Sequence, residues 1–366
     1  AAIEKKKQIL AQIESWAQDL AGGTCPQPVR EQLYKILFRP DKNAPEYKAV
    51  VEASKASQKA PLALLQDAGA IDSPWDFHWQ RFLFDWFPKG TGFPNLQAPA
   101  ITDELPLANV QAFSIDDSHT TEIDDALSLQ GLGTGTVTVG VHIAAPGLAV
   151  QPGSPIDQVG RQRLSTVYMP GYKITMLPDD LVARFTLAAG AAQPAVSLYV
   201  TTDEQFEILS HESRVERVPI AANLRLHELE PLMEADALNR GDVPTCAHGD
   251  TLLTLWRFAA ACAGRRGKPA TQAGLHDYHY QIDGPLHDKS TGAVLDPAAC
   301  HIHIEARKRG SPVDMLVAEL MILANATWGQ LLADHNVPGL YRGQVAGKVR
   351  MTTTAVPHEG LGVACY

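Results

Sequence analysis

A run rich in proline and glycine between residues 88 and 109 constrains the fold most, because no regular helix or strand can continue through it. Proline removes a backbone donor, and glycine raises the entropic cost of ordering the chain. The residues concerned are Pro88, Gly90, Gly92, Pro94, Pro99 and Pro106. We therefore interpret residues 88–109 as a linker between residues 1–87 and residues 110–366. With 366 residues, the chain also exceeds the usual size of a single hydrophobic core, which favours two domains.

The first 87 residues carry the apolar spacing of short helices. One helix is predicted around Ile9 to Leu20, before Gly22 and Gly23, and three more over residues 29–38, 45–54 and 61–68. The aromatic residues of 75–87 have mixed spacing. We expect them to pack in a core or between domains, and a surface that stacks on bases is the alternative.

Residues 110–366 have a different texture, in which short runs typical of strands precede helical periodicity. Strands are predicted over residues 136–143 and 195–201, and helices over residues 252–264 and 313–332. This order of elements predicts an α+β domain.

The segment 116–125 contains five carboxylates within ten residues: Asp116, Asp117, Glu122, Asp124 and Asp125. Apolar residues flank it on both sides, so the carboxylates are expected at the edge of a core, where like charges repel strongly. A bound cation would relieve that repulsion, and oxygen ligands without cysteine favour Mg²⁺ or Mn²⁺ over structural zinc. A solvated acidic loop is the alternative interpretation.

The spacing within this acidic segment adds two expectations. Thr121 occupies the sixth position, where an EF-hand loop needs glycine, so a calcium loop of that type is a poor match. Asp124 and Asp125 would point to opposite faces of a regular strand, so a single site for both predicts a bend or bulge there. Two divalent ions in such a site suit the hydrolysis of phosphate esters.

Charge and cysteine content limit the class of protein. The net charge of −10 argues against a protein coated in nucleic acid, although residues 1–60 hold ten basic against seven acidic side chains. No signal-peptide pattern and no apolar run of spanning length is evident, so we expect a cytoplasmic, membrane-free protein. The five cysteines lie far apart, which predicts free thiols.

Eight ordered motifs resemble the catalytic-domain signatures of the ribonuclease II (RNB) family. They occupy residues 113–116, 122–127, 141–144, 165–170, 176–178, 319–325, 340–342 and 357–362. The resemblance implies a ribonuclease II-type catalytic domain in a magnesium-dependent exoribonuclease. Such an enzyme hydrolyses single-stranded RNA processively from the 3′ end to nucleoside 5′-monophosphates.

The resemblance also assigns roles by position. Asp116, Glu122, Asp124 and Asp125 match the four acidic positions that hold the metal and orient the attacking water, and Asp124 is expected to be the most sensitive to substitution. The position of Glu122 is more often aspartate in the family, and its extra methylene implies that either the helper ion sits differently or this residue binds through water.

Two further positions match residues that contact RNA in the family. Tyr168 matches a tyrosine that stacks on the 3′-terminal base, and an ordinary core tyrosine is the alternative. Glu319 matches a glutamate near the terminal ribose, and a surface carboxylate on an amphipathic helix is the alternative. We expect the histidine at position 119 to pair with carboxylates, and the pairs at 276/279 and 301/303 lack a third ligand for zinc.

The chain departs from the family pattern in three places. Relatives begin with OB-fold barrels, whereas residues 1–87 favour a helix-turn-helix-like domain that binds RNA phosphates through Lys35, Arg39 and Lys42, with a protein-docking module as the alternative. Only about fifteen residues separate the motifs at 340–342 and 357–362, where relatives have several tens. An arginine-bearing motif and a C-terminal OB barrel are expected beyond Tyr366.

These observations favour a monomeric exoribonuclease that acts on single-stranded RNA. An RNA-binding protein of the same fold with weakened catalysis is the first alternative, because Glu122 departs from the family pattern and the arginine motif is missing. A metallophosphatase acting on small molecules is the second.

Overall fold

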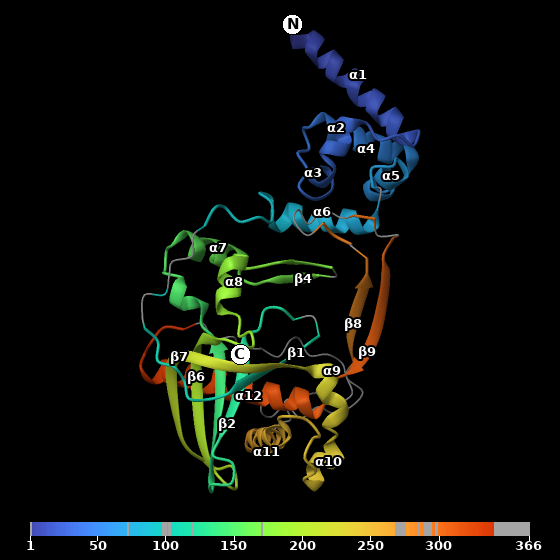
Figure 1. Cartoon of the computed structure of the whole chain (residues 1–366). Coiled ribbons are helices and arrows are strands. Elements are labelled where there is room, and N and C mark those ends of the chain that lie inside the picture. Colours follow the sequence, from blue (N-terminus) through green and yellow to red (C-terminus); the bar gives the residue numbers. More distant parts are fainter. Residues whose placement is uncertain are drawn as a thin grey trace. The chain divides into compact units, whose positions relative to one another are not determined.

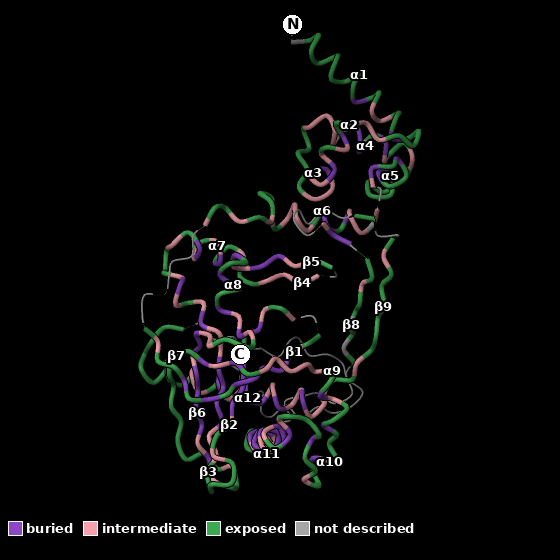
Figure 2. Tube along the Cα trace, in the orientation of Figure 1, coloured by how far each residue is buried: buried purple, intermediate pink, exposed green. Residues whose placement is uncertain are grey.

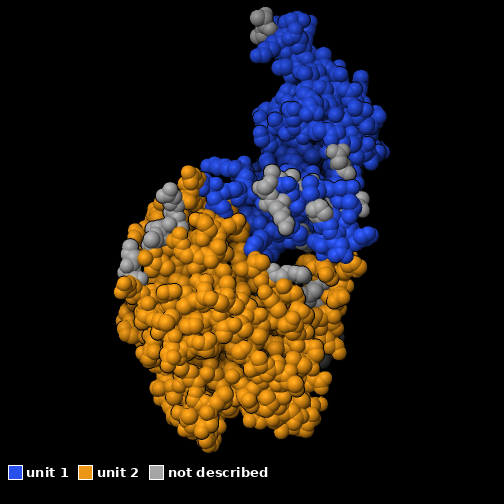
Figure 3. Space-filling model, viewed as in Figure 1, with its two compact units in different colours: residues 1–94, 168–174, 282–301 blue, residues 95–167, 175–281, 302–366 orange. Residues whose placement is uncertain are grey.

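The computed structural model divides the chain into two compact units (Figure 3), and we describe each by itself. Residues 2–339 are described apart from residues 72, 97–100, 102–103, 119, 170, 268–275, 285, 289–294 and 297–298. The first unit comprises residues 1–94, 168–174 and 282–301, and the second comprises residues 95–167, 175–281 and 302–366. The division after residue 94 falls inside the predicted linker. Two segments of the predicted second domain belong to the first unit.

Helices form most of the first unit (Figure 1). They are α1 (Ala2–Ala21), α2 (Gln27–Glu31), α3 (Leu33–Phe38), α4 (Pro45–Ser57), α5 (Pro61–Asp67) and α6 (Pro74–Trp86). Proline opens α4, α5 and α6, where its missing N–H would have no partner in any case. The single helix predicted over residues 29–38 was wrong, because the backbone leaves helical geometry at Gln32 (φ −102°, ψ 11°) and separates α2 from α3.

The aromatic segment that the spacing left ambiguous is helix α6. Phe77 is buried and its ring lies 5.7 Å from that of Tyr34. Trp79 is also buried, and its ring meets those of Tyr172 and His287 edge-on within the same unit. These two residues therefore pack in a core, whereas Trp86 is 73% exposed.

The three basic residues predicted to bind RNA lie on the surface of the first unit. Lys35, Arg39 and Lys42 are all exposed. The guanidinium of Arg39 lies 3.2 Å from an Asp85 carboxylate oxygen and stacks over the ring of Phe84. Its charge is therefore already partly neutralised within the unit.

A closed five-stranded barrel forms the centre of the second unit. Its strands are β1 (Ala112–Asp116), β2 (Asp125–Gln130), β3 (Thr136–Ala144), β6 (Ala192–Asp203) and β7 (Ile208–Arg225), in that order. Neighbouring strands are antiparallel except β1 and β7, whose parallel pairing closes the barrel. Strands β3 and β6 confirm the two runs predicted from the sequence.

The second unit also holds the shorter elements η1 (Pro146–Ala149), α7 (Pro155–Arg163), α8 (Asp179–Phe185), α9 (Leu226–Leu229), η2 (Glu230–Leu232) and α10 (Ala235–Arg240). Two further sheets have two strands each, β4 (Val167–Met169) with β5 (Tyr172–Ile174) and β8 (His276–Asp283) with β9 (His301–Lys308). Strand β5 and most of β4 belong to the first unit, and most of β8 and β9 belong to the second. The cysteines in the described part of the chain, Cys25, Cys246, Cys262 and Cys300, are free thiols, as predicted.

Two long helices, α11 (Gly249–Arg266) and α12 (Pro312–Asp334), pack on one face of the barrel strands. Leu127, Val139 and Leu198 meet these helices in the largest apolar cluster, and Figure 2 shows that much of α11 is buried or half-buried. By length and mean hydropathy (1.4), α12 could cross a membrane, a test that core helices of soluble proteins also pass. In this fold Leu316 and Leu320 are core residues of the second unit.

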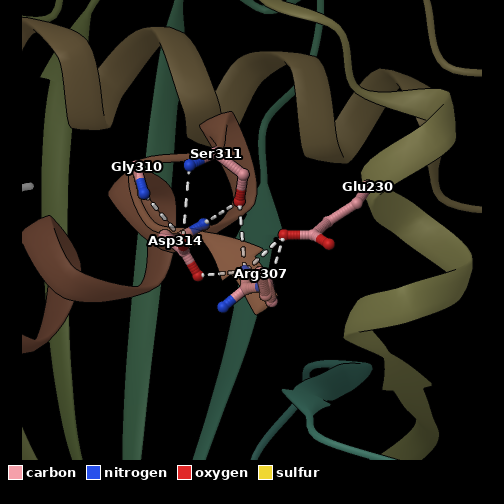
Figure 4. A network of polar contacts seen from close by, with 5 residues as sticks. All are labelled: Glu230, Arg307, Gly310, Ser311 and Asp314. Carbon is pink, nitrogen blue, oxygen red and sulfur yellow. Dashed lines mark hydrogen bonds and ion pairs between the residues drawn. The ribbon is translucent and has the colours of Figure 1, made fainter. Parts of the chain in front are cut away.

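A network of polar contacts fixes the start of α12 (Figure 4). Ser311 and Asp314 form a capping box, which satisfies backbone N–H groups that the first turn leaves open. The guanidinium of Arg307 bonds to Asp314 (2.6 Å) and to Glu230. Burial alone would lower the pKa of Arg307, but the two carboxylates raise it above its usual range.

The opposite face of the strands carries a buried polar network. Both ring nitrogens of His142 are hydrogen-bonded, Nε2 to Ser128 Oγ (2.8 Å) and Nδ1 to Ser197 Oγ (2.8 Å). Burial lowers the pKa of His142 to about 3, so the imidazole stays neutral. Gly140 makes room for these contacts, because a Cβ there would lie 2.3 Å from Ser128 Oγ and 2.8 Å from His142 Nε2.

We predict that Gly140→Ala destabilises the second unit by about 2–3 kcal/mol, the usual cost of overpacking a rigid core. The matched control is Gly264→Ala in α11, where a new Cβ meets nothing within 4 Å. It should instead stabilise the unit by about 0.5 kcal/mol, because alanine loses less backbone entropy in a helix. Calorimetric unfolding of both variants measures the difference, and equal effects would contradict the packing argument.

Candidate active site

The acidic segment forms the loop between two barrel strands. Strand β1 ends at Asp116 and β2 begins at Asp125, so Asp124 belongs to the loop. The alternation rule for strands therefore does not separate Asp124 from Asp125. Ile123 anchors the loop: its side chain is buried, and its N–H donates to Thr186 Oγ1 (2.8 Å).

The carboxylates of this loop interact electrostatically. Burial raises the pKa of Asp125 to about 6, and the negative charges of Asp116 and Asp124 add to the effect. The pKa of Asp124 is raised by partial burial of its carboxylate and then by Glu122 and Asp116. The loop therefore gathers negative charge that disfavours full ionisation, as expected for a site built to receive a cation.

Asp116 is additionally oriented by neighbouring polar groups. Ser114, which is fully buried, donates from Oγ to Asp116 Oδ2 at 2.5 Å. Asn223 on β7 in turn donates to Ser114 Oγ (2.9 Å). Burial raises the pKa of Asp116, while the Ser114 hydrogen bond and the positive charge of Arg225 oppose that rise.

The donor chemistry of the loop fits magnesium, but the described side chains do not close around an ion. Asp116, Glu122, Asp124 and Asp125 offer only carboxylate oxygens, the ligands that Mg²⁺ prefers. Within the described ranges, no group of three or more His, Cys, Asp or Glu side chains is arranged to hold a metal ion. Binding would therefore require these carboxylates to converge.

Glu319 is neither exposed nor free. Its side chain in α12 is 1% exposed. It forms a bidentate ion pair with Arg266 at the end of α11, in which Arg266 Nε lies 3.1 Å from Glu319 Oε2 and Arg266 Nη2 contacts Glu319 Oε1. The surface position considered from the sequence was therefore wrong. Its spacing from Leu316 and Leu320 places it on the buried stripe of the helix.

The remaining candidate residues belong to the first unit or fall outside the described residues. Tyr168 lies on β4 and is 69% exposed, so it is not a core tyrosine, and it belongs to the first unit. The histidine at position 119 and the motifs at 340–342 and 357–362 fall outside the described residues. Three residues that were not predicted from the sequence contact the acidic loop or Ser114: Asn223, Arg225 and His227.

We predict a pH-dependent stability that depends on Asp125. Its pKa is higher in the folded state (about 6) than in the unfolded chain (3.8), so its contribution is fully present below pH 3.8 and is lost as the pH rises through 6. In the absence of divalent ions, the free energy of unfolding of Asp125→Asn, taken relative to wild type, should therefore increase by about 2 kcal/mol as the pH rises from 4 to 7. Urea unfolding at each pH measures this.

Comparison with the variant is essential here because His142 acts in the opposite direction. Its lowered pKa removes stability as the pH falls from 6.5 towards 3 in both proteins, so it cancels in the difference. A constant difference between Asp125→Asn and wild type across this range would contradict the burial and charge repulsion assigned to Asp125.

A second prediction concerns the ion pair in the helices. Glu319→Gln should destabilise the second unit by about 1–3 kcal/mol, because Arg266 loses its charged partner but can still reach water. The double variant Glu319→Gln with Arg266→Met should recover part of that loss. Thermal unfolding tests both, and a double variant as unstable as the sum of two independent losses would contradict the pairing.

A model of the RNB domain matches residues 105–358 of this chain. Exoribonuclease 2 of Vibrio parahaemolyticus is 26% identical over 310 residues, which cover 81% of this chain and 43% of that protein. Ribonuclease II of Arabidopsis thaliana chloroplasts and mitochondria is 23% identical over 70% of this chain and 30% of its own length. The chain thus spans less than half the length of these relatives.

Solved structures show the same fold. An active-site mutant of the Dss1 exoribonuclease from Candida glabrata aligns with a TM-score of 0.59 at 15% identity, over 95% of this chain and 50% of that one. Mycoplasma genitalium RNase R in complex with double-stranded RNA aligns with a TM-score of 0.51, also at 15% identity, over 71% of this chain and 45% of that one. With its α+β architecture and the match over residues 105–358, this chain belongs to the RNB-domain family.

Proposed function

We propose that this chain carries the catalytic unit of an exoribonuclease that hydrolyses single-stranded RNA processively from the 3′ end and releases nucleoside 5′-monophosphates. One observation carries the proposal: within an RNB domain, Asp116, Asp124 and Asp125 gather at the junction of β1 and β2, where burial and then neighbouring carboxylates raise the pKa of each. Relatives named exoribonucleases support the substrate class.

Magnesium is part of this proposal, and Asp116, Glu122, Asp124 and Asp125 would hold it. When bound, the ion would lower the pKa of a water ligand and offset the charge of the RNA phosphate. The chain's own groups prepare for this role. Ser114 holds the Asp116 carboxylate in one orientation, and Asp125 is partly buried at the start of β2.

Two residues are proposed to contact the RNA. The exposed ring of Tyr168 would stack on the 3′-terminal base, since every base presents a π-face. Glu319 would contact the terminal ribose only after RNA binding opens its buried ion pair with Arg266. Contact with a ribose hydroxyl would favour RNA over DNA.

A second candidate function is RNA binding without cleavage. It is favoured by the lack of any closed group of three metal-binding side chains within the described ranges. Glutamate at position 122, where the family more often has aspartate, also favours this second function. The two functions share a ligand and differ only in whether the RNA becomes shorter.

The test uses the natural full-length protein with 5′-labelled single-stranded RNA. In Mg²⁺ we expect a ladder that shortens from the 3′ end, no shortening in EDTA, and recovery when Mg²⁺ is restored. Binding of intact RNA without any shortening in Mg²⁺ would reject the nuclease and favour the second function. A duplex RNA and a DNA of the same sequence are compared in parallel.

Asp124→Asn tests the site itself. We predict that it lowers the cleavage rate by on the order of a thousandfold and leaves RNA affinity within about threefold, because one charge is removed with little change of shape. The matched control is Asp117→Asn, an exposed carboxylate of the same loop to which no catalytic role is assigned. Equal losses in both variants, or loss of RNA binding in Asp124→Asn, would contradict the role given to Asp124.

A further inference from the structure

Three alternate residues at the end of β7 and the start of α9 reach the acidic loop or the serine that orients Asp116. Asn223 and Arg225 belong to β7, and His227 lies in the first turn of α9. The parallel pairing of β1 and β7 places Asp116 directly opposite Arg225. Because alternate residues of a strand share one face of the sheet, Asn223 and Arg225 project from the same face of β7, and His227 reaches the loop from α9.

Arg225 bridges two points of the loop. Its Nη1 donates to the carbonyl oxygen of Asp117 at 2.9 Å and to that of Thr120 at 3.4 Å. The Asp117 carbonyl also accepts the Thr120 N–H at 3.1 Å, which closes a turn. The guanidinium therefore fixes the turn from outside and places a permanent positive charge beside Asp116.

The neighbours of Arg225 secure the same region. Asn223 donates to Ser114 Oγ (2.9 Å) and to the Leu187 carbonyl (3.0 Å), and it accepts from the Ala189 N–H (2.8 Å). Ser118 Oγ lies 2.9 Å from Nδ1 of His227. The loop is thus tied to β7 and α9 at several points along its first half.

This tethering opposes a definite force. The loop and the strand ends that flank it carry five carboxylates, and repulsion among them favours an open loop whenever no cation is present. Arg225 bonds to backbone carbonyl oxygens, so its hydrogen bonds do not occupy the carboxylate oxygens of the loop. The loop can therefore be held in place while Asp116, Asp124 and Asp125 remain available.

We propose that Arg225 is a positioning residue of the RNA hydrolysis proposed above, holding the acidic loop in place on β7 so that its carboxylates can converge on a divalent cation. The inference rests on the proposed function for its kinetic consequences only. Arg225 does not touch the RNA in this account.

The test compares Arg225→Gln and Arg225→Lys with Arg217→Gln. The control removes a cation from the same strand, at an exposed position that has no contact with the acidic loop among the described residues. Glutamine removes the positive charge and the planar guanidinium with its several N–H donors. Lysine keeps the charge but cannot reproduce the planar geometry. Full-length natural protein is used throughout.

Two readouts do not depend on cleavage. Hydrogen exchange by mass spectrometry should show at least tenfold faster exchange of the peptide covering residues 117–124 in Arg225→Gln, with peptides from α11 unchanged. Mn²⁺ binding, followed by electron paramagnetic resonance, should weaken by about 10- to 100-fold, the usual effect of losing a group that orients metal ligands. Arg225→Lys should be intermediate in both, and Arg217→Gln should match wild type.

Kinetics supply the third readout. In Arg225→Gln we expect kcat to fall by about 10- to 100-fold with KM for RNA within about threefold of wild type, as for a small misplacement of catalytic groups. An increase in KM alone would mean that Arg225 contacts RNA directly and would overturn the inference. Unchanged exchange and Mn²⁺ binding in Arg225→Gln would also overturn it.

These outcomes separate the inference from the proposed function. Failure of the wild-type protein to shorten RNA would defeat the proposed function, and the exchange and Mn²⁺ measurements would still decide the role of Arg225. A wild-type protein that cleaves RNA, together with an Arg225→Gln variant that behaves like Arg217→Gln in every readout, would overturn the inference alone.

Discussion

The parallel pairing of β1 with β7 is the contact on which the candidate site depends. It closes the barrel by joining the first strand to the last. The other neighbouring strands of the barrel pair antiparallel. It also brings the end of β1, where the acidic loop begins, beside Asn223 and Arg225 from more than a hundred residues further along the chain. Without this pairing, Ser114 would lose its contact with Asn223, and the turn after Asp116 would lose its contacts with Arg225.

The second constraint is electrostatic. A folded protein normally avoids gathering like charges at the edge of a core, because each carboxylate makes ionisation of the next less favourable. Here burial, and after it the neighbouring carboxylates, raise the pKa of Asp125 to about 6 and also raise the pKa of Asp124. Carboxylates with raised pKa values are typical of functional sites, where a bound cation relieves the repulsion between them. The structure tolerates it because the apolar face of the same strands packs well against α11 and α12.

The helices and strands that were predicted correctly are those whose pattern of apolar residues is contained in one short stretch of the sequence. The helices α4 and α5 and the strands β3 and β6 lie close to their predicted ranges. Barrel closure and the 18-residue strand β7 were not predicted, because they depend on pairing between distant segments. The break at Gln32 was missed because residues 29–38 keep an apolar spacing across it. Periodicity alone cannot detect a change of backbone geometry that preserves the buried face.

In the candidate site, too, residues that are close in the sequence were predicted, and residues brought together by the fold were not. The carboxylates were found because they are contiguous in the sequence. Glu319 had a usable signal, since its spacing from Leu316 and Leu320 placed it on the buried stripe of α12, and burial of a carboxylate requires a partner such as Arg266. Asn223, Arg225 and His227 had no such signal. Their alternation resembles that of any polar strand edge, and only the fold brings them to the loop.

The most direct test of the central claim is hydrolysis of single-stranded RNA in ¹⁸O-labelled water with Mg²⁺, followed by mass spectrometry of the released nucleotides. If carboxylates of the acidic loop promote attack by water at the 3′ end, the wild-type protein releases nucleoside 5′-monophosphates that carry one ¹⁸O on the phosphate, and Asp124→Asn releases almost none. Intact RNA, unlabelled products, or equal release by Asp124→Asn would contradict the account.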